Sequence, residues 1–399
     1  MFAPLSSPGL ALASALTALP APPAAIAPPL PPHASAWGGS GGAIRGVTIG
    51  PIESLRHPGK GYGSPAYERT LDEAVAMGAT WVSLTPFGRV WDLTPEGIDM
   101  TFEAPWPDNR AAVLRAIRQA RARGLRVLVV PHLWVESGEW RALIDPGDDA
   151  GWARWAAAYR TFVLSWAEVA REGDADMLSV GVELRTWVTS PARAASMREV
   201  IDAVRGVYPG LLTYSANWDD VEHTLILDGI DVVGINAFYP LAHQDGAPLD
   251  ALVEGGKRVA DGLGWLARDV GKPVLLTEVG YTTRKDPAIR PWEWPDGMTG
   301  VVVDQQAQAE AYHALLAPLV GSRWCAGFFV WRLYADPDDV SQEAEWGFSP
   351  RAKLAELVVR DAFTARWASD GPWLPGEIAG RHRARVPGFL GWDLAPDLF

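Results

Sequence analysis

"MLSVGVEL", residues 177–184, is the stretch that decides the fold, because it has the pattern of a strand buried on both faces. Its apolar and small residues run together without the polar alternation of a half-exposed strand, which is typical of parallel sheets covered by helices. One carboxylate, Glu183, closes the run. Because an ionised carboxylate is costly in an apolar setting unless its neighbours compensate it, Glu183 is a candidate functional residue.

Seven similar runs surround this one, and helical patterns separate them. They are "AIRGVTIG" (43–50), "ATWVSLTPF" (79–87), "LRVLVVPHLW" (125–134), "LLTYSAN" (211–217), "IDVVGINAFYP" (230–240), "PVLLTEVGY" (273–281) and "AGFFVWRLY" (326–334). Eight strands alternating with helices predict a (β/α)8 TIM barrel of the α/β class. A doubly wound open sheet is the alternative, but it usually carries a Gly-rich turn directly after its first strand. The Gly-rich stretch of this chain, "GYGSPA", lies well past the end of the first strand, which disfavours the open sheet.

Helix signals fall between these runs. Ser or Asp caps the first turn of a helix, Pro suits the first helical position, and Gly commonly follows the last residue. On these signals we expect helices to begin at Ser64-Pro65, Asp108, Ser190-Pro191 and Asp304, and also to span 151–172 and 248–271. After the fifth run, "DDVEHTLILDG" allows only a short helix.

Composition predicts three regions along the chain. Residues 1–42 contain no Asp, Glu, Lys or Arg, and "GLALASALTAL" followed by a Pro/Ala-rich stretch predicts an export signal and a linker, although the usual positive start is missing. The alternative for this leader is a low-complexity segment without a targeting signal. Residues 43–360 form the predicted catalytic barrel, and 361–399 an irregular C-terminal extension that packs on it. A periplasmic or extracellular protein is the expectation.

Charge and residue usage exclude several classes of protein. A net charge of −13 disfavours nucleic acid as a partner. Cys325 is the only cysteine, and no apolar run after the leader is long enough to span a membrane. The seven histidines show no metal-ligand spacing, so neither a metal site nor a cofactor is predicted. The 20 tryptophans exceed ordinary usage and suit flat, partly apolar ligands such as sugar rings.

The carboxyl ends of the predicted strands supply the candidate site, because barrel active sites lie there. The residues at these ends are His132, Trp134, Glu183, Asn217, Trp218, Asn236, Tyr239, Glu278, Trp331 and Arg332. Glu183 and Glu278 each close an apolar run, on the fourth and seventh strands. Two carboxylates facing one pocket are the arrangement that glycoside hydrolysis uses. The alternative for each Glu alone is a buried salt bridge with Arg185, Arg284 or Arg332.

These features resemble clan A of the glycoside hydrolases, and within it family 113, which includes β-1,4-mannanases. The resemblance rests on "IRGVTIG", "VVPHLWV", "VGVEL", "YSANWDD", "IDVVGINAFYPL", "LLTEVGY" and "WGFSPRAK", which together span residues 44–353. It implies that Glu183 is the acid/base and Glu278 the nucleophile. It further implies that Tyr239 hydrogen-bonds the nucleophile and that Trp331 floors the pocket around the sugar that is cleaved.

One position departs from the clan. Many of its members have Asn directly before the acid/base, where it holds the sugar 2-hydroxyl, and this chain has Val182. Asn217 or Asn236 is the candidate replacement for that hydrogen bond. The departure leaves the identity of the sugar open.

The function expected from this reasoning is retaining hydrolysis of a β-linked polysaccharide or oligosaccharide, with β-1,4-mannan as the first choice. The expected mechanism is double displacement by a monomeric enzyme that needs only its carbohydrate substrate. Two alternatives stay open. One is a carbohydrate-binding barrel without catalytic activity, and the other is a glycosidase that acts on peptidoglycan or an exopolysaccharide.

Overall fold

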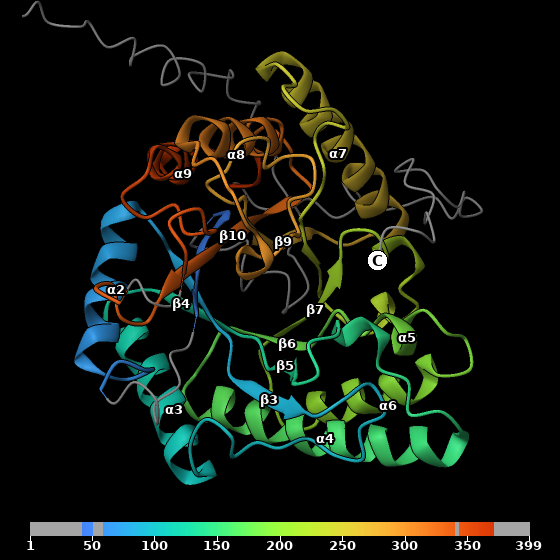
Figure 1. Cartoon of the computed structure of the whole chain (residues 1–399). Helices are drawn as coiled ribbons and strands as arrows, with labels where there is room; N and C mark the ends of the chain where they lie inside the picture. The colour runs from blue at the N-terminus through green and yellow to red at the C-terminus, as the bar shows by residue number, and fades with distance from the viewer. Residues whose placement is uncertain (1–41, 51–58, 340–342, 371–399) are drawn as a thin grey trace, which may run out of the picture.

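Eight parallel strands close into a barrel in the computed structural model, which describes residues 42–50, 59–339 and 343–370 (Figure 1). In chain order the barrel strands are β1 (Ile44–Gly50), β2 (Trp81–Leu84), β4 (Arg126–Val129), β6 (Met177–Val182), β7 (Leu211–Asn217), β8 (Val232–Asn236), β9 (Val274–Val279) and β10 (Cys325–Tyr334). Around the barrel their order is β1-β10-β9-β8-β7-β6-β4-β2. The predicted (β/α)8 fold is confirmed, since every strand pairs in parallel with its neighbours in the chain and the last closes on the first.

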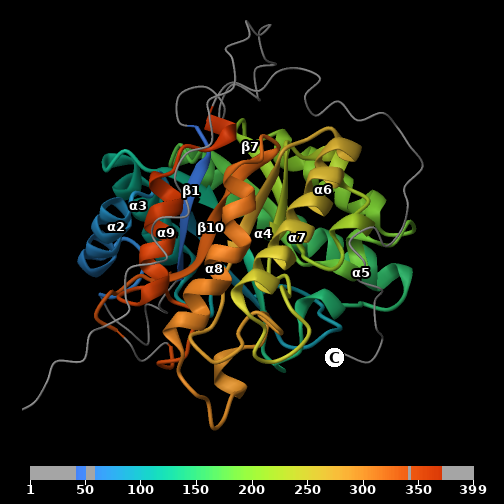
Figure 2. The same cartoon turned by 90° about the horizontal axis from the view of Figure 1, so that it is seen from above.

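Helices surround these strands on the outside (Figure 2). They are α2 (Pro65–Met77), α3 (Trp106–Ala122), α4 (Asp149–Glu172), α5 (Arg185–Val188), α6 (Ala194–Arg205), α7 (Leu249–Val270), α8 (Gln305–Val320) and α9 (Leu354–Thr364). After β7 the chain forms two short 3-10 helices, Val221–His223 and Leu227–Gly229, in line with the short helix expected there.

The predicted helix starts are confirmed at two positions and displaced at two others. The side chains of Ser64 and Asp304 cap α2 and α8 as expected. In contrast, α3 begins before Asp108, which lies in its first turn. The carbonyl oxygen of Pro105 accepts the first backbone hydrogen bonds of this helix, so the helix starts there. The carbonyl group of Ser190 closes a separate turn, so α6 begins only at Ala194.

The barrel interior is filled with large apolar side chains rather than left open. Trp81, Met177, Val182 and Phe329 belong to one buried cluster of inward-facing strand residues. A Cβ atom at Gly46 would lie 2.2 Å from the Phe329 ring, so glycine is needed there to admit the aromatic side chain. This packed interior forms the floor beneath the carboxyl ends of the strands.

The prediction of one continuous strand over 125–134 is wrong. The strand divides at Pro131 into β4 and a second strand, β5 (His132–Val135), and the preceding run divides in the same way at Pro86 into β2 and β3 (Phe87–Val90). Since proline has no backbone N–H to donate to a ladder, both strands leave the barrel at this point. β3 and β5 then pair in parallel as a separate two-stranded sheet.

The end of the described chain packs on the start of the barrel. The helix α9 runs to Thr364, past the predicted domain boundary at 360, and Trp367 stacks on Phe328 at 5.9 Å. The Asp370 carboxylate accepts a 2.8 Å hydrogen bond from the backbone of Ala43 and pairs with Arg45 at 2.9 Å. The rest of the predicted extension, 371–399, and all but the last residue of the predicted leader lie outside the described residues.

Two kinds of feature are missing from the part of the chain that the structure describes, a membrane-spanning helix and a metal-binding cluster. Within it, no helix combines the length and apolarity that crossing a bilayer requires. Across the same residues, His, Cys, Asp and Glu side chains form no group of three or more that could hold a metal ion.

Candidate active site

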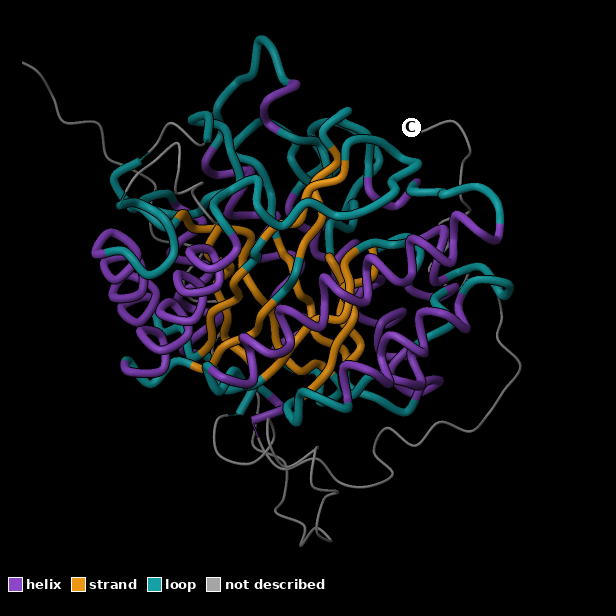
Figure 3. The backbone as a smooth tube through the Cα atoms, turned by 90° about the horizontal axis from the view of Figure 1, so that it is seen from below, coloured by secondary structure: helices purple, strands orange, loops and turns teal. Residues whose placement is uncertain are grey.

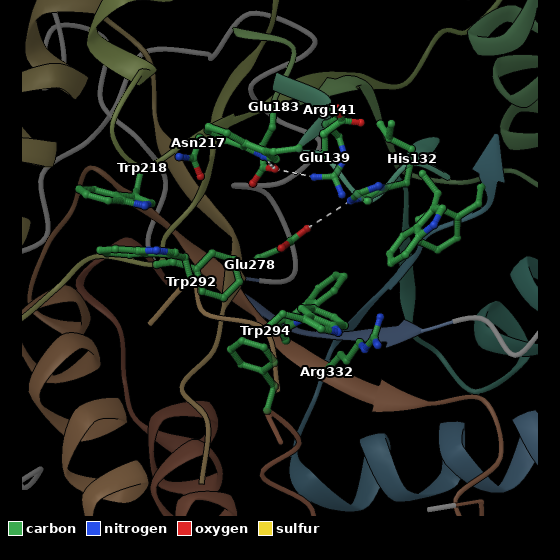
Figure 4. A pocket seen from close by; sticks show the side chains of 18 of the residues that line it. His132, Glu139, Arg141, Glu183, Asn217, Trp218, Glu278, Trp292, Trp294 and Arg332 are labelled. Atoms are coloured by element: carbon green, nitrogen blue, oxygen red, sulfur yellow. Dashed lines mark hydrogen bonds and ion pairs between the residues drawn. The ribbon is translucent and has the colours of Figure 1, made fainter. Parts of the chain in front are cut away.

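A cavity of about 450 Å³ lies over the carboxyl ends of the barrel strands. Figure 3 shows the strands enclosed by helices, with long loops gathered at one end of the barrel. Nine of the 19 residues that line the cavity are Phe or Trp, namely Phe87, Trp134, Trp140, Trp218, Phe238, Trp292, Trp294, Trp331 and Phe348. Glu183 and Glu278 are its two buried carboxyl groups and point into it from different strands (Figure 4).

Glu183 directly follows β6 and is held in a conformation that side chains rarely adopt. Its φ is 51°, in the left-handed region, and its backbone N–H donates to the carbonyl oxygen of Ser215 at 2.9 Å. The next N–H, that of Leu184, donates to the hydroxyl of Tyr214 at 2.7 Å. A conformation of this kind costs free energy and persists only where the surroundings fix it, as they do at functional sites.

Three donors converge on the Glu183 carboxyl group. One oxygen, Oε2, accepts from the indole Nε1 of Trp140 at 2.8 Å and from the Arg141 guanidinium at 2.5 Å. The other oxygen, Oε1, accepts from the Asn236 amide at 2.9 Å. Because an ionised carboxyl group only accepts hydrogen bonds, this surrounding of donors is the pattern of a carboxylate.

Glu278 lies within β9 and has a less polar environment. Burial raises the pKa of its carboxyl group well above the usual range, and the nearby charge of Glu183 adds to the shift. The cations of Arg141 and Arg332 and a hydrogen bond from Asn236 act in the opposite direction. The two acids therefore have clearly different environments, as a pair with separate acid and base roles requires.

His132 approaches Glu278 from the other side of the cavity. Its Nε2 lies 4.0 Å from Oε1 of Glu278. Burial, assisted by the positive charge of Arg141, lowers the pKa of this imidazole well below its usual range. The contact is therefore made by a neutral ring, and His132 contributes a polar side chain to the site without adding a charge.

Asn236 connects the two acids. Its amide nitrogen donates to Glu183, it lowers the pKa of Glu278 through a hydrogen bond, and its carbonyl oxygen accepts from the Thr277 hydroxyl at 2.9 Å. The Thr277 bond fixes which way the amide faces. In contrast, the amide of Asn217, which also lines the cavity, donates to Asp219 at 2.5 Å.

Aromatic rings shape the cavity around the acids. The rings of Trp218 and Trp292 stack 5.3 Å apart with an angle of 20° between their planes. In Figure 4 this pair and His132 lie on opposite sides of the two carboxylates. Trp331 is 5% exposed and packs with Phe238 and Phe348. Such a wall of rings around two acids suits the flat apolar faces of sugars.

The structure brings together all but one of the predicted site residues. His132, Trp134, Glu183, Asn217, Trp218, Glu278 and Trp331 line the cavity, and Asn236 lies beneath it in contact with Glu183. The predicted hydrogen bond from Tyr239 to Glu278 is wrong. The Tyr239 hydroxyl is fully buried without a hydrogen-bond partner, and its ring lies edge-on to Trp218 at 5.8 Å. It lies past the end of β8, outside the cavity lining.

Two functional candidates escaped the sequence reasoning, because they come from a loop. Trp140 and Arg141 follow β5, and both donate to Glu183. Of the partners named for the alternative of a buried salt bridge, Arg185 pairs with Asp219 and Asp220, and Arg284 pairs with Glu293. The ion pair of Glu183 is made with Arg141 instead. The only available signal was an adjacent aromatic and cation, "EWR", in the loop after the third predicted strand.

Val182, the departure from the clan pattern, does not face the cavity. It is 2% exposed and belongs to the apolar cluster inside the barrel. A register shift in β6 between Ser179 and Val182 accompanies this placement. Val182 thus contributes to the floor of the site and does not line the cavity.

A (β/α)8 barrel with two buried acids in an aromatic cavity, one directly after its fourth strand and one within its seventh, has the arrangement of a glycoside hydrolase. The chain belongs to Glycoside Hydrolase Family 113, whose family model matches residues 56–347. A search of curated proteins found no match.

Solved structures agree with this assignment. The chain is similar to the family 113 β-mannanase of Alicyclobacillus acidocaldarius, with 26% identity and a TM-score of 0.70, over 83% of this chain and 99% of that one. A second family 113 β-1,4-mannanase is 21% identical, with a TM-score of 0.69 over 82% and 100% of the two chains. A family 5 mannosidase from Rhizomucor miehei shares the fold, at 12% identity and a TM-score of 0.58 over 81% and 93%.

Proposed function

We propose that this enzyme is a retaining hydrolase of β-1,4-mannan, with Glu278 as the nucleophile and Glu183 as the acid/base. One observation carries the proposal, namely that these two buried carboxyl groups share a single aromatic cavity at the ends of β6 and β9. Their strands are the fourth and seventh of the barrel, as the clan resemblance implies for these roles.

The proposed reaction has two displacements. Glu278 attacks the anomeric carbon as a carboxylate while Glu183 gives its proton to the departing oxygen, which leaves as a hydroxyl of the released sugar. The remaining sugar is then bound to Glu278 as an ester. Glu183, now deprotonated, takes a proton from water as the water attacks the same carbon, and Glu278 leaves as a carboxylate. Two inversions retain the β configuration.

This mechanism needs one proton shared between the two acids. Because they lie in one buried cavity and repel each other when both are charged, the doubly ionised state is disfavoured, as the raised pKa of Glu278 indicates. Arg141 and Arg332 limit this effect and permit one negative charge in the cavity. The electrostatics therefore favour a pair that holds one proton over a pair with two charges.

The choice of β-1,4-mannan is supported by the 26% identical relative, which is described as a β-mannanase and is covered over 99% of its length. Peptidoglycan, an exopolysaccharide or another β-linked glycan is the competing substrate. A panel of mannan, glucan, xylan and chitosan oligosaccharides separates these possibilities by relative kcat/KM. Mannan hydrolysis at least tenfold above the others supports the proposal, and a different preferred glycan overturns the substrate assignment.

The roles of the two acids are tested by rescue with azide on an aryl β-mannoside. In Glu278→Ala, azide takes the place of the missing nucleophile, and a single inversion should give an α-mannosyl azide. In Glu183→Ala the covalent intermediate still forms, so azide should give a β-mannosyl azide. Exchanged products would reverse the two assignments, and an inverted sugar released by the wild type would exclude retention.

A further inference from the structure

The two-stranded sheet outside the barrel has one packed face and one face toward the cleft. β3 and β5 pair with Phe87 opposite His132 and Arg89 opposite Trp134. Backbone bonds from Glu136 to Val90 and from Ser137 to Trp91 continue the pairing past both strands. Since side chains alternate between the faces of a strand, Phe87, Arg89 and Trp91 share a face with His132, Trp134 and Glu136.

The opposite face is fully packed. Val90, Leu133 and Val135 are buried there, and a Cβ atom at Gly88 would lie 2.7 Å from the ring of Phe162 in α4. The sheet is thus fixed on the body of the protein. Its other face carries two exposed aromatic side chains, Trp134 and Trp91.

Exposure rises along this face as it leaves the catalytic cavity. His132, beside Glu278, is 3% exposed, whereas Trp134 is 40% and Trp91 is 58% exposed. Trp134 still lines the cavity, so the face is continuous with the site of cleavage. Burial of a large aromatic side chain is favourable, so a ligand that covered Trp134 and Trp91 would gain binding free energy from them.

Arg89 supports the rings of Trp134 and Trp91, one directly and one through Phe102. It is 8% exposed and donates from Nε to Glu103 at 3.0 Å and from Nη1 to Glu136 at 2.7 Å. Its guanidinium lies 5.6 Å from the ring of Trp134 and 4.4 Å from the ring of Phe102.

The Phe102 ring in turn packs 6.2 Å from Trp91. Both tryptophans are therefore supported by the same buried group before any ligand arrives, which lowers the entropy cost of binding.

We propose that this face, carried by Trp134 and Trp91, is a second sugar-binding platform for the glycan chain whose bond is cleaved in the cavity. The proposal rests on the proposed function for the identity of that glycan. From strand geometry the Cα atoms of the two residues are about 8 Å apart, which is comparable to the span of a disaccharide. Trp134 stacks on a sugar near the cleaved bond, and Trp91 on a sugar further out.

Chain-length dependence of activity tests the platform. In Trp91→Ala the ratio of kcat/KM for mannohexaose over mannotriose should fall by about 5- to 30-fold, since a lost stacking contact is worth one or two kcal/mol. Leu357→Ala removes an apolar side chain of similar exposure (59%) from α9 and should leave the ratio as in the wild type. An unchanged ratio in both Trp91→Ala and Trp134→Ala would overturn the platform.

A binding measurement separates this proposal from the proposed function. Affinity electrophoresis of the full chain in gels with mannan, glucan, xylan or chitosan needs no catalysis, and Trp91→Ala should migrate faster than the wild type in one of them. Retardation by a glycan other than mannan keeps the platform and rejects mannan as the substrate. A wild type that no glycan retards, or a Trp91→Ala variant that only changes a dimer into a monomer in light scattering, overturns the platform.

Discussion

Replacing Glu278 by Gln should abolish hydrolysis and at the same time make the fold more stable at neutral pH. The residue is 7% exposed, and burial together with the charge of Glu183 raises the pKa of its carboxyl group well above the usual range. Gln has nearly the same shape but no charge. At pH 7 we expect a gain in the free energy of unfolding of about 1–3 kcal/mol, the usual cost of an imperfectly compensated buried polar group. The midpoint of thermal unfolding should rise by roughly 2–4 °C per kcal/mol.

The pH dependence of this gain has a definite sign. Below about pH 4.3, the usual pKa of Glu in an unfolded chain, the carboxyl group is protonated in both states and the two proteins should be equally stable. As the pH rises, the unfolded chain loses this proton while the native state keeps it. The wild type therefore loses stability relative to Glu278→Gln until the pH passes the raised pKa of the native state.

Urea unfolding of both proteins between pH 4 and pH 8 measures this difference, and exposed Glu96→Gln provides the matched control. The control should follow the wild type at every pH. Turnover of Glu278→Gln should fall by roughly 10⁴-fold or more, as is usual when a nucleophile is removed. A variant that is less stable than the wild type at pH 7, or a gain that grows in acid, would refute the argument. Either result would mean that the native site stabilises the Glu278 carboxylate.

Three further changes test other parts of the structure. Arg141→Gln removes a cation that lowers the pKa of Glu278, so the nucleophile holds its proton more tightly, and kcat/KM should fall by about 10- to 100-fold on mannan and on aryl mannosides alike. Asn236→Ala should lower kcat by about 10²-fold and change KM little, as stopped assays at saturating substrate will measure. Gly327→Ala should destabilise by about 2 kcal/mol or more in urea unfolding, because φ is 124° and the new Cβ would lie 2.1 Å from a backbone oxygen of the first strand, whereas exposed Gly97→Ala should change little.

The barrel could be predicted because its strands are short apolar runs with a regular alternation of helices between them. Glu183 and Glu278 stood out for the same reason, since each is the acid that closes such a run. Their meeting in one cavity follows from topology alone, because parallel strands end at the same side of a barrel. The sequence pattern therefore predicts best the positions of residues whose backbone is held by hydrogen bonds between strands.

The environment of Glu183 could not be predicted in this way. Arg141 lies 42 residues before it in the chain, in a loop whose path has no periodic signal. The loop takes its position from the two-stranded sheet, which exists because Pro86 and Pro131 end the pairing of two neighbouring barrel strands together. The sequence pattern treated both runs as single strands, and only the three-dimensional pairing shows that the two strands leave the barrel side by side at these prolines.

Tyr239 shows the limit of transferring a role by resemblance. The residue follows β8 near the site, yet its hydroxyl is buried outside the cavity, and burial with the charges of Glu222, Asp219 and Asp220 raises its pKa well above the usual range. A side chain's direction depends on neighbours that the strand pattern does not specify. In this chain Asn236, which donates to Glu183, is the neighbouring polar side chain that lowers the pKa of Glu278 instead.

The hydrogen-bond donors around Glu183 affect which of the two acids holds the proton before substrate binds. In the structure Arg141, Trp140 and Asn236 all donate to Glu183, while burial favours the proton on Glu278. Attack by Glu278 requires the opposite distribution. Under the proposed roles substrate binding moves the proton from Glu278 to Glu183, and the departing oxygen of the glycan favours this move when it takes the place of a donor at Glu183. Arg141 is the donor whose loss would change the charge balance most, since it is the one cation among the three and it also lowers the pKa of Glu278.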